Sequence, residues 1–360
     1  MKLAIITDAW NPQVNGVVTT LTRTRACIEH LGHEVLVISP DGFRTLPCPT
    51  YPEIRLAVFP QSRIARRIES FGPDAIHIAT EGPLGAAARR YCNRNGLSFT
   101  TSYHTQFPQY VRNRVPVPES WSYAFLRRHH GFAIRTLVPT EHQRRDLVAH
   151  GFDNVVIWSR GVDTNVFRPD LRSAGELSRP IWIYVGRVAV EKNLEAFLSL
   201  DLPGTKLIVG DGPDRAGLAL KYPQAHFAGY LFGTALAASL ASADVFVFPS
   251  RTDTFGLVML EAMACGTPVA AYPVIGPIDV VRDGFSGYLD EDLGRAARRA
   301  LELPRENARA AALERTWENA TAEFLSHLTR ADGTQEPIGA IEIDRGALRT
   351  IPDAWQRDLG

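Results

Sequence analysis

Short apolar runs alternate with segments of helical periodicity through most of this chain, and the alternation occurs twice. The first series opens with apolar runs at 3–7 and 34–39, separated by an amphipathic segment at 17–31, and continues to 155–158. The second series opens at 181–186 and continues to 267–273. Continuous apolar strands joined by helices are typical of parallel sheets covered on both faces. The sequence therefore predicts two doubly wound α/β domains.

The alternation stops between about 160 and 180, where Gly, Pro, Asn, Ser and several charged residues take its place. The predicted division is a first domain at 1–165, an interdomain linker at 166–180, a second domain at 181–315, a C-terminal helix at 316–330 that crosses back to the first domain, and a tail at 331–360 with no assigned role.

Charge is distributed unevenly, although the 360 residues carry no net charge. Residues 1–170 contain 20 Arg and Lys against 14 Asp and Glu, so the first half either faces an anionic partner or presents a solvated basic surface. The four cysteines form no CxxC pair, which favours a reducing compartment. No apolar run approaches the roughly 20 residues of a membrane span, and we expect a cytoplasmic protein.

The stretch RTDTFGLVMLEAMACGTPV at 251–269 places two carboxylates, Asp253 and Glu261, around a Phe255-Gly256-Leu257 turn that opens a helix. Free amides and the positive end of a helix dipole suit a phosphate. A carboxylate one turn further along can accept hydrogen bonds from ribose hydroxyls. This stretch predicts a site for a sugar nucleotide.

The stretch GRVAVEKN at 186–193 places Arg187 at a strand exit and Lys192 near the start of the next helix. Two cations there suit a diphosphate, and Lys192 is one of only four lysines beside thirty-five arginines. The alternative is a surface ion pair with Glu191.

Four further segments lie at predicted strand exits, where open α/β sheets bind ligands. Asn15-Gly16 lets the backbone approach a phosphate closely, although an Asn-Gly pair is also a common turn or cap. Gly212 and Tyr230 could border a nucleotide base, or Gly212 could belong to an ordinary turn. His104 could hydrogen-bond a sugar hydroxyl or the developing charge at an anomeric carbon.

A metal site has little support in the sequence. Asp290-Glu291-Asp292 has the form of a cation motif. However, it lies before a long predicted helix, and acidic side chains are favourable at the N-terminus of a helix. We expect no metal and no cofactor.

These motifs together resemble the retaining glycosyltransferases of family four, and the resemblance runs from about 1 to 330. It implies the GT-B fold, in which two Rossmann-like domains face a cleft. It also implies the following roles: Arg187 and Lys192 hold the donor diphosphate, Glu261 binds the ribose, Asp253 approaches the donor sugar, Gly16 contacts the phosphate through its backbone, and His104 lies beside the sugar near the reaction centre.

The chain departs from the family at two positions, since Asp253 replaces the usual Glu and Asn15 stands where many members have glycine. NGVV and TDTFG resemble the branch that glycosylates lipids, including mannosyl-, glucosyl- and sulfoquinovosyl-diacylglycerol synthases. The resemblance implies transfer of a hexose from a UDP- or GDP-sugar to diacylglycerol or a glycolipid. Alternatives are a soluble or polyprenyl-linked glycan acceptor and, more remotely, a sugar-nucleotide epimerase or a non-catalytic binder.

Basic residues lie beside aromatic ones in the first half, as on proteins that dock on anionic bilayers. We expect peripheral attachment to the cytoplasmic face of the inner membrane and no nucleic-acid partner. The alternative is a groove for a soluble glycan. The residues concerned are Arg63, Arg66, Arg67, Arg112, Arg114, Arg127 and Arg128 with Trp121, Tyr123 and Phe125.

Overall fold

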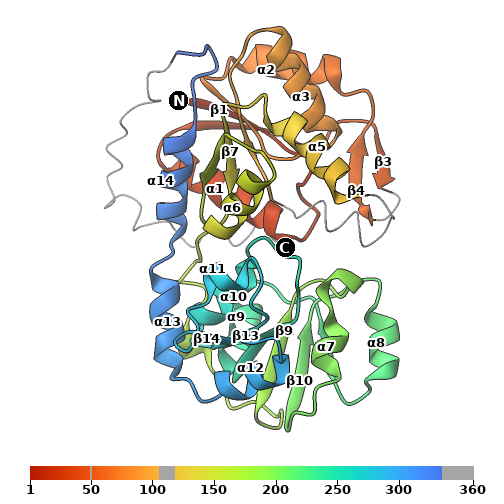
Figure 1. Ribbon diagram of the computed structural model, residues 1–360, viewed down its shortest axis with the longest axis vertical. Coiled ribbons are helices and arrows are strands. Elements are labelled where there is room, and N and C mark those ends of the chain that lie inside the picture. Colours follow the sequence, from red (N-terminus) through yellow and green to blue (C-terminus); the bar gives the residue numbers. More distant parts are fainter. Residues whose placement is uncertain (49–50, 105–117, 335–360) are drawn as a thin grey trace. The chain divides into compact units, whose positions relative to one another are not determined.

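The computed structural model describes residues 1–48, 51–104 and 118–334. They form two compact units (Figure 1). Unit 1 contains Met1–Arg160 and the described residues from Trp317 onward, and unit 2 contains Gly161–Thr316. Each unit is built on a parallel sheet, as the apolar runs predicted, and each sheet has six strands.

The sheet of unit 1 has the strand order β2-β1-β5-β6-β7-β8. The bounds are β2 (Glu34–Ile38), β1 (Lys2–Ile6), β5 (Ala75–Ile78), β6 (Thr100–Ser102), β7 (Arg135–Val138) and β8 (Val155–Ile157). An antiparallel hairpin of β3 (Thr45–Cys48) and β4 (Tyr51–Ala57) lies outside this sheet and was not predicted. The helices are α1 (Gly16–His30), α2 (Gln61–Phe71), α3 (Pro83–Arg94), α5 (Glu119–His130), α6 (Glu141–Ala149) and α14 (Trp317–His327).

Helices cover both faces of this sheet, because successive residues of a strand point to opposite sides. Leu3 and Ile5 of β1 pack in a core with residues of α1 and α14. Ala4 and Ile6 pack in a second core with residues of α2 and α3. The expected C-terminal helix corresponds to α14, whose Phe324 is fully buried in unit 1.

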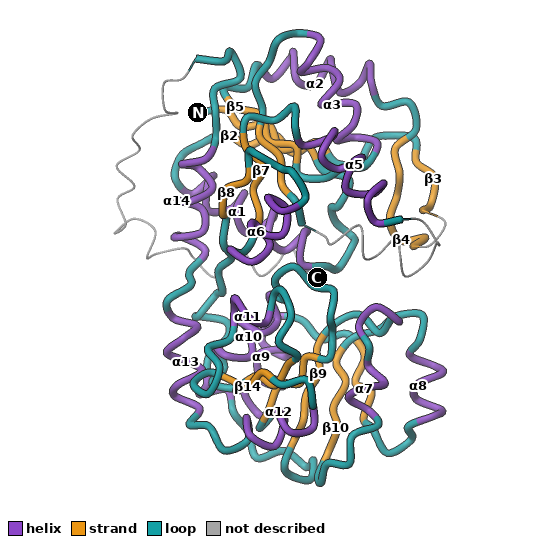
Figure 2. Tube along the Cα trace, in the orientation of Figure 1, coloured by secondary structure: helices purple, strands orange, loops and turns teal. Residues whose placement is uncertain are grey.

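The sheet of unit 2 has the order β11-β10-β9-β12-β13-β14. Figure 2 draws the strands in orange. Its bounds are β11 (His226–Gly229), β10 (Thr205–Val209), β9 (Ile181–Val185), β12 (Val245–Phe248), β13 (Val269–Ala271) and β14 (Gly287–Leu289). The helices are η1 (Pro169–Leu171), η2 (Val190–Lys192), α7 (Leu194–Leu198), α8 (Arg215–Lys221), α9 (Gly233–Ser242), α10 (Leu257–Ala264), α11 (Pro277–Val280), α12 (Leu293–Ala300) and α13 (Arg305–Leu313). This is the strand order of a dinucleotide-binding Rossmann fold.

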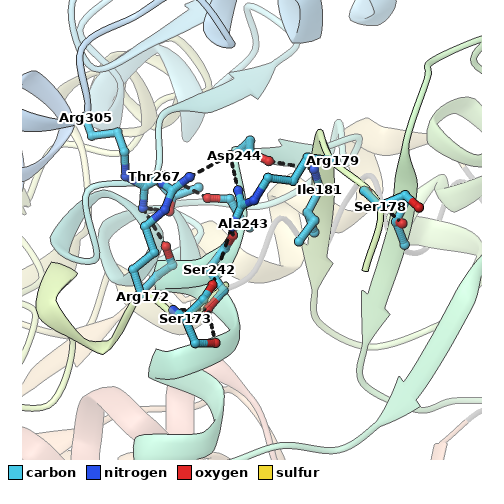
Figure 3. Close-up of polar contacts among 12 residues, drawn as sticks. Arg172, Ser173, Ser178, Arg179, Ile181, Ser242, Ala243, Asp244, Thr267 and Arg305 are labelled. Atoms are coloured by element: carbon cyan, nitrogen blue, oxygen red, sulfur yellow. Dashed lines mark hydrogen bonds and ion pairs between the residues drawn. The ribbon is translucent and has the colours of Figure 1, made fainter. Parts of the chain in front are cut away.

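Residues 166–180, expected to be a linker, are anchored to unit 2. Asp244 accepts hydrogen bonds from Arg172 at 2.9 Å and from Arg179 at 2.5 Å (Figure 3). Phe167 is buried in the core of the same unit. Unit 1 ends at Arg160, whereas the sequence placed the end of the first domain at 165.

Candidate functional site

The strand order of unit 2 reverses between β9 and β12, and polar residues gather at the carboxyl ends of these two strands. Arg187 follows β9 and Asp253 follows β12. Lys192 Nζ lies 2.5 Å from Asp253 Oδ1, and the two side chains are 17% and 20% exposed. Ligands of open α/β sheets bind where the order reverses. The residues that the sequence singled out in GRVAVEKN and TDTFG therefore meet at such a point.

A short turn presents Lys192 to this position. Lys192 ends the 3-10 helix η2, and the next residue, Asn193, adopts the left-handed conformation with φ 53°. The Asn193 side-chain amide donates to the Pro249 carbonyl at 3.2 Å. That bond connects the loop after β9 to the segment after β12.

Arg187 lies on the same loop and is 28% exposed along its side chain. Its Nη1 is 3.9 Å from Glu191 Oε1, and the Glu191 side chain is almost fully buried. The ion pair with Glu191 that the sequence allowed as an alternative is thus present, but its two charged groups are far apart for an ion pair. The Lys192–Asp253 ion pair was not predicted.

The turn before α10 has the geometry that the sequence indicated. Gly256 has φ 80°, and a Cβ there would lie 2.7 Å from the Met259 methyl group. In the described part of the chain, no acceptor receives the backbone N–H groups of Phe255, Gly256 or Leu257. The Phe255 side chain is buried, so this residue can offer a ligand only its backbone. The N-terminus of α10 can bind an anion.

Glu261 and Leu257 lie four residues apart on α10, on one face of the helix. Both are partly buried, whereas Met259, Leu260 and Met263 are fully buried in the core. Glu261 therefore lies on the less buried face, one turn beyond the open amides.

Gly212 and Tyr230 lie in the loops after β10 and β11. A Cβ on Gly212 would approach the Val188 carbonyl oxygen to 2.3 Å, so close packing against the loop that carries Arg187 explains this glycine. Tyr230 is 49% exposed and stacks on Phe232 with ring centroids 5.8 Å apart. Two stacked, half-exposed aromatic rings can offer a flat surface to a base.

In unit 1, Asn15 caps helix α1. Its side-chain oxygen accepts hydrogen bonds from the amides of Val17 and Val18, both at 3.0 Å. Gly16 is exposed, and its N–H has no acceptor among the described residues. Asn15 is thus a capping residue, and the Gly16 amide remains the donor that could meet a phosphate.

The N-terminus of α3 is occupied by a side chain of the protein itself. Asp8 accepts hydrogen bonds from the Leu84 amide at 2.9 Å and the Thr80 hydroxyl at 2.9 Å. Burial raises the pKa of Asp8, and these hydrogen bonds oppose the rise. Asp8 is therefore a structural cap.

His104 follows β6 and is partly buried. Arg160 Nη2 lies 3.1 Å from its Nδ1, and the edge of Trp158 lies against its ring with centroids 5.8 Å apart. Burial and the Arg160 charge lower the pKa of His104 well below 6.5, so its ring is neutral at pH 7. Sequence reasoning missed Arg160, because a single arginine before the segment 161–180 gives no sign of a partner 56 residues away.

Two further histidines, His77 and His130, contact hydroxyl groups of β6, the strand that precedes His104. His77 is fully buried between the hydroxyls of Thr100 and Ser102, each 2.9 Å from a ring nitrogen. Burial and then the Arg160 charge lower its pKa to about 3. His130, also buried, lies 2.9 Å from the Thr101 hydroxyl.

The aromatic and basic residues of unit 1 are only partly arranged as the sequence suggested. On α5, Trp121 is 70% and Phe125 55% exposed. Tyr123 was wrongly grouped with them, because helical geometry turns it inward, where it stacks on His150 at 3.6 Å. Arg127 and Arg128 of α5 and Arg63 and Arg66 of α2 are exposed, Arg67 donates to the Val37 carbonyl, and Arg112 and Arg114 lie outside the described residues.

Asp290-Glu291-Asp292 precedes α12, as predicted. Asp292 Oδ1 accepts a hydrogen bond from the Arg295 amide at 3.0 Å, which is a helix cap. In the regions that the structure describes, no three His, Cys, Asp or Glu side chains gather as metal ligands do. None of the described helices combines the length and apolar character needed to span a bilayer.

Two family models match the chain, one in each unit. "Glycosyltransferase Family 4" matches residues 14–166, and "Glycosyl transferases group 1" matches residues 179–305. The two models together extend over every strand of both sheets except β1.

Two curated relatives illustrate the similarity. A GDP-mannose-dependent alpha-mannosyltransferase of Mycobacterium tuberculosis is 32% identical over 368 residues, which covers 92% of this chain and 97% of the relative. Sulfoquinovosyl transferase SQD2 of Arabidopsis thaliana is 34% identical over 297 residues, which covers 73% of this chain and 58% of the relative.

Solved structures share the fold at low sequence identity. Sucrose-phosphate synthase from Thermosynechococcus elongatus has a TM-score of 0.69 at 20% identity and covers 90% of this chain and 97% of its own. Anabaena Alr3699/HepE in complex with UDP-glucose has a TM-score of 0.66 at 16% identity, covering 91% and 99%. These likenesses, together with the two parallel sheets, show the GT-B fold.

Proposed function

This chain belongs to glycosyltransferase family 4, and we propose that it transfers a hexose from a UDP- or GDP-sugar to a lipid acceptor with retention of anomeric configuration. The observation that carries the proposal is the arrangement in unit 2. Arg187, Lys192 and the open amides of α10 lie at the carboxyl ends of β9 and β12. Cations and unpaired amides at a helix N-terminus suit a diphosphate.

Each remaining part of the donor has a candidate ligand. We assign the ribose hydroxyls to Glu261, the base to the surface of Tyr230 and the loop at Gly212, and the donor sugar to Asp253. From unit 1, the Gly16 amide is assigned to the phosphate and His104 to the sugar. The family resemblance supports these roles, and the partial exposure of Glu261 and the half exposure of Tyr230 are consistent with them.

The proposed chemistry is a front-face substitution. The bond between the anomeric carbon and the phosphate oxygen breaks, and the acceptor oxygen bonds to the same face of that carbon. The acceptor proton passes to the departing phosphate oxygen, so no protein base is needed. Arg187, Lys192 and the α10 amides stabilise the negative charge that develops on the diphosphate. We propose that these groups do so without a metal ion.

The acceptor is assigned to a membrane lipid because of the outer face of α5. Trp121 and Phe125, one helical turn apart, are both exposed beside Arg128. Aromatic side chains can enter the interfacial layer of a bilayer, and each cation near an anionic surface contributes about 1 kcal/mol. We therefore propose peripheral attachment to the cytoplasmic face of the inner membrane. SQD2, a relative, is named as a sulfoquinovosyl transferase, and other relatives are named as GDP-mannose-dependent mannosyltransferases.

A donor and acceptor screen tests the proposal. The full chain is incubated with UDP-, GDP- or ADP-hexoses and with anionic vesicles that contain diacylglycerol or are free of it. We expect a glycolipid with an α-linkage from an α-configured donor, and its formation should require diacylglycerol. A β-linked product would contradict retention, and transfer only to a soluble or polyprenyl-linked glycan would contradict the lipid acceptor. A donor isomer formed without released nucleoside diphosphate would indicate an epimerase.

A further inference from the structure

Arg160, the last residue of unit 1, is a buried cation. It is 4% exposed, and its Nη1 donates to the carbonyls of Trp158 and Ser159 at 2.5 and 3.0 Å. Its guanidinium also lies over the Trp158 ring at 4.3 Å. Burying a charge is costly unless its hydrogen bonds are satisfied, so these contacts fix the side chain in one orientation.

This orientation brings Arg160 Nη2 to 3.1 Å from His104 Nδ1. A guanidinium can only donate hydrogen bonds, and it remains protonated at neutral pH. Nδ1 must therefore accept, and a neutral imidazole then carries its single proton on Nε2. Trp158, in edge contact with the His104 ring, limits rotation of the ring away from Arg160.

Helix α14 holds the segment that carries Arg160 in place. Glu323 Oε2 accepts a hydrogen bond from the Ser159 amide at 2.6 Å. Burial lowers the pKa of Arg160, and the negative charge of Glu323 partly opposes that decrease. Trp158 Nε1 donates to the Ala320 carbonyl at 3.1 Å. The segment 158–160 is thus held on α14 by two hydrogen bonds.

We propose that Arg160 is a positioning residue that holds His104 in its Nε2–H tautomer, so that His104 donates a hydrogen bond to an oxygen of the donor sugar. The inference rests on the proposed function for the role of His104 and extends it. The proposed tautomer also decides between the two roles of His104 that the sequence left open, which are a hydrogen bond to a sugar hydroxyl and contact with the developing charge at an anomeric carbon. An N–H group presents the positive end of its dipole, which suits a hydroxyl oxygen and opposes positive charge developing at an anomeric carbon.

The tautomer can be measured without any activity. Long-range ¹H–¹⁵N spectra of the full chain, labelled at histidine nitrogens, show which nitrogen of each ring carries the proton. The signals of His104 are assigned by their loss in His104→Ala. We expect protonated Nε2 and unprotonated Nδ1 at pH 7.5. A protonated Nδ1 in the wild-type chain would overturn the proposal.

Kinetic coupling tests the consequence. Arg160→Met keeps the side-chain volume and removes every donor, and we expect kcat to fall about 10- to 100-fold while the donor KM changes less than about threefold. In the His104→Ala background the same substitution should lower kcat by less than about threefold, because its target is absent. An equal loss in both backgrounds would mean that Arg160 acts only through general stability.

Arg135→Met is the matched control, since Arg135 also binds α14 by donating to the Ser326 and His327 carbonyls. Arg135 lies at the start of β7, paired with Thr100, whereas His104 follows the end of β6. It should leave both kcat and the His104 spectrum unchanged. Failure of the proposed function would be recognised separately. The wild-type chain would then transfer no hexose from any nucleotide sugar, whatever tautomer His104 has.

Discussion

Lys192 Nζ and Asp253 Oδ1 lie 2.5 Å apart, although 61 residues separate them in the sequence. Each side chain is about one-fifth exposed, so the pair is shielded from solvent more than a surface ion pair. Asp253 thus pairs with the ammonium group that the proposed function assigns to the donor diphosphate. If Lys192 binds the donor diphosphate as proposed, the carboxylate has two effects: it orients Lys192, and it competes with the diphosphate for the ammonium group.

Removing the Asp253 charge should separate these effects. We expect Asp253→Asn to raise the affinity for free UDP or GDP about 3- to 10-fold, because a competing charge worth roughly 1 kcal/mol is lost. Turnover should nevertheless fall at least about 10-fold if Asp253 contacts the sugar. Titration calorimetry and steady-state kinetics measure the two quantities. Glu195→Gln is the control, because Glu195 Oε1 lies 2.6 Å from Lys221 Nζ in an exposed ion pair. Unchanged turnover in Asp253→Asn would argue against contact between Asp253 and the sugar.

Glu261 should affect binding more than chemistry. Loss of hydrogen bonds from a carboxylate to ribose hydroxyls costs about 1.5–3 kcal/mol, so Glu261→Gln should raise the donor KM about 10- to 100-fold and change kcat little. The exposed Glu302, beyond the end of α12, provides the control Glu302→Gln. A large loss of kcat at constant KM would contradict the assignment of Glu261 to the ribose hydroxyls.

The α5 face should determine membrane binding. Replacing Trp121 and Phe125 by serine is expected to abolish sedimentation with anionic vesicles, because both aromatic anchors are lost while the buried face of α5 is retained. Leu220→Ser, at an 84% exposed position of α8 in unit 2, should leave sedimentation unchanged. Sedimentation that persists in the double variant, or that resists high salt, would contradict docking through this face.

Acid should destabilise unit 1 through its buried histidines. Burial lowers the pKa of His77 and His129 to about 3, and the unfolded chain titrates near 6.5. Between pH 6.5 and pH 3 the unfolded state binds more protons than the folded state. The free energy of unfolding is therefore highest above about pH 6.5 and decreases as the pH falls towards 3. For fully buried His77, lowering the pH from 6.5 to 5 costs about 2 kcal/mol. Urea unfolding at the two pH values should show a smaller difference for His77→Gln than for the wild type, whereas exposed His226→Gln should retain the full difference.

The sheets could be predicted because buried parallel strands are continuous apolar runs. Residues 75–79 and 205–210 correspond to β5 and β10 within one or two residues. The hairpin of β3 and β4 was missed because its strands carry proline and charge, such as Pro47 and Arg55, and show no alternation. Strand β14 was also missed, because its sequence Gly287-Tyr288-Leu289 contains glycine and no β-branched apolar residue.

Local motifs indicated the site better than pairwise contacts did. The Gly256 turn and the α12 cap depend on residues within a few positions, and both appear as predicted. The contacts of Lys192 with Asp253 and of Arg160 with His104 join segments 61 and 56 residues apart, and such pairs leave no spacing pattern in one sequence. Tyr123 was misplaced although helical periodicity could have shown that it lies opposite Trp121 and Phe125.

The turnover of Lys192→Ala tests the assignment of the donor site most directly. Removing a major donor to a developing charge typically costs about 10²–10³ in rate, and we expect kcat to fall by that factor, at least as much as donor affinity falls. Lys221→Ala removes a lysine from the remote pair with Glu195 and should stay within about twofold of the wild type. Near-wild-type turnover of a folded Lys192→Ala variant would contradict the account.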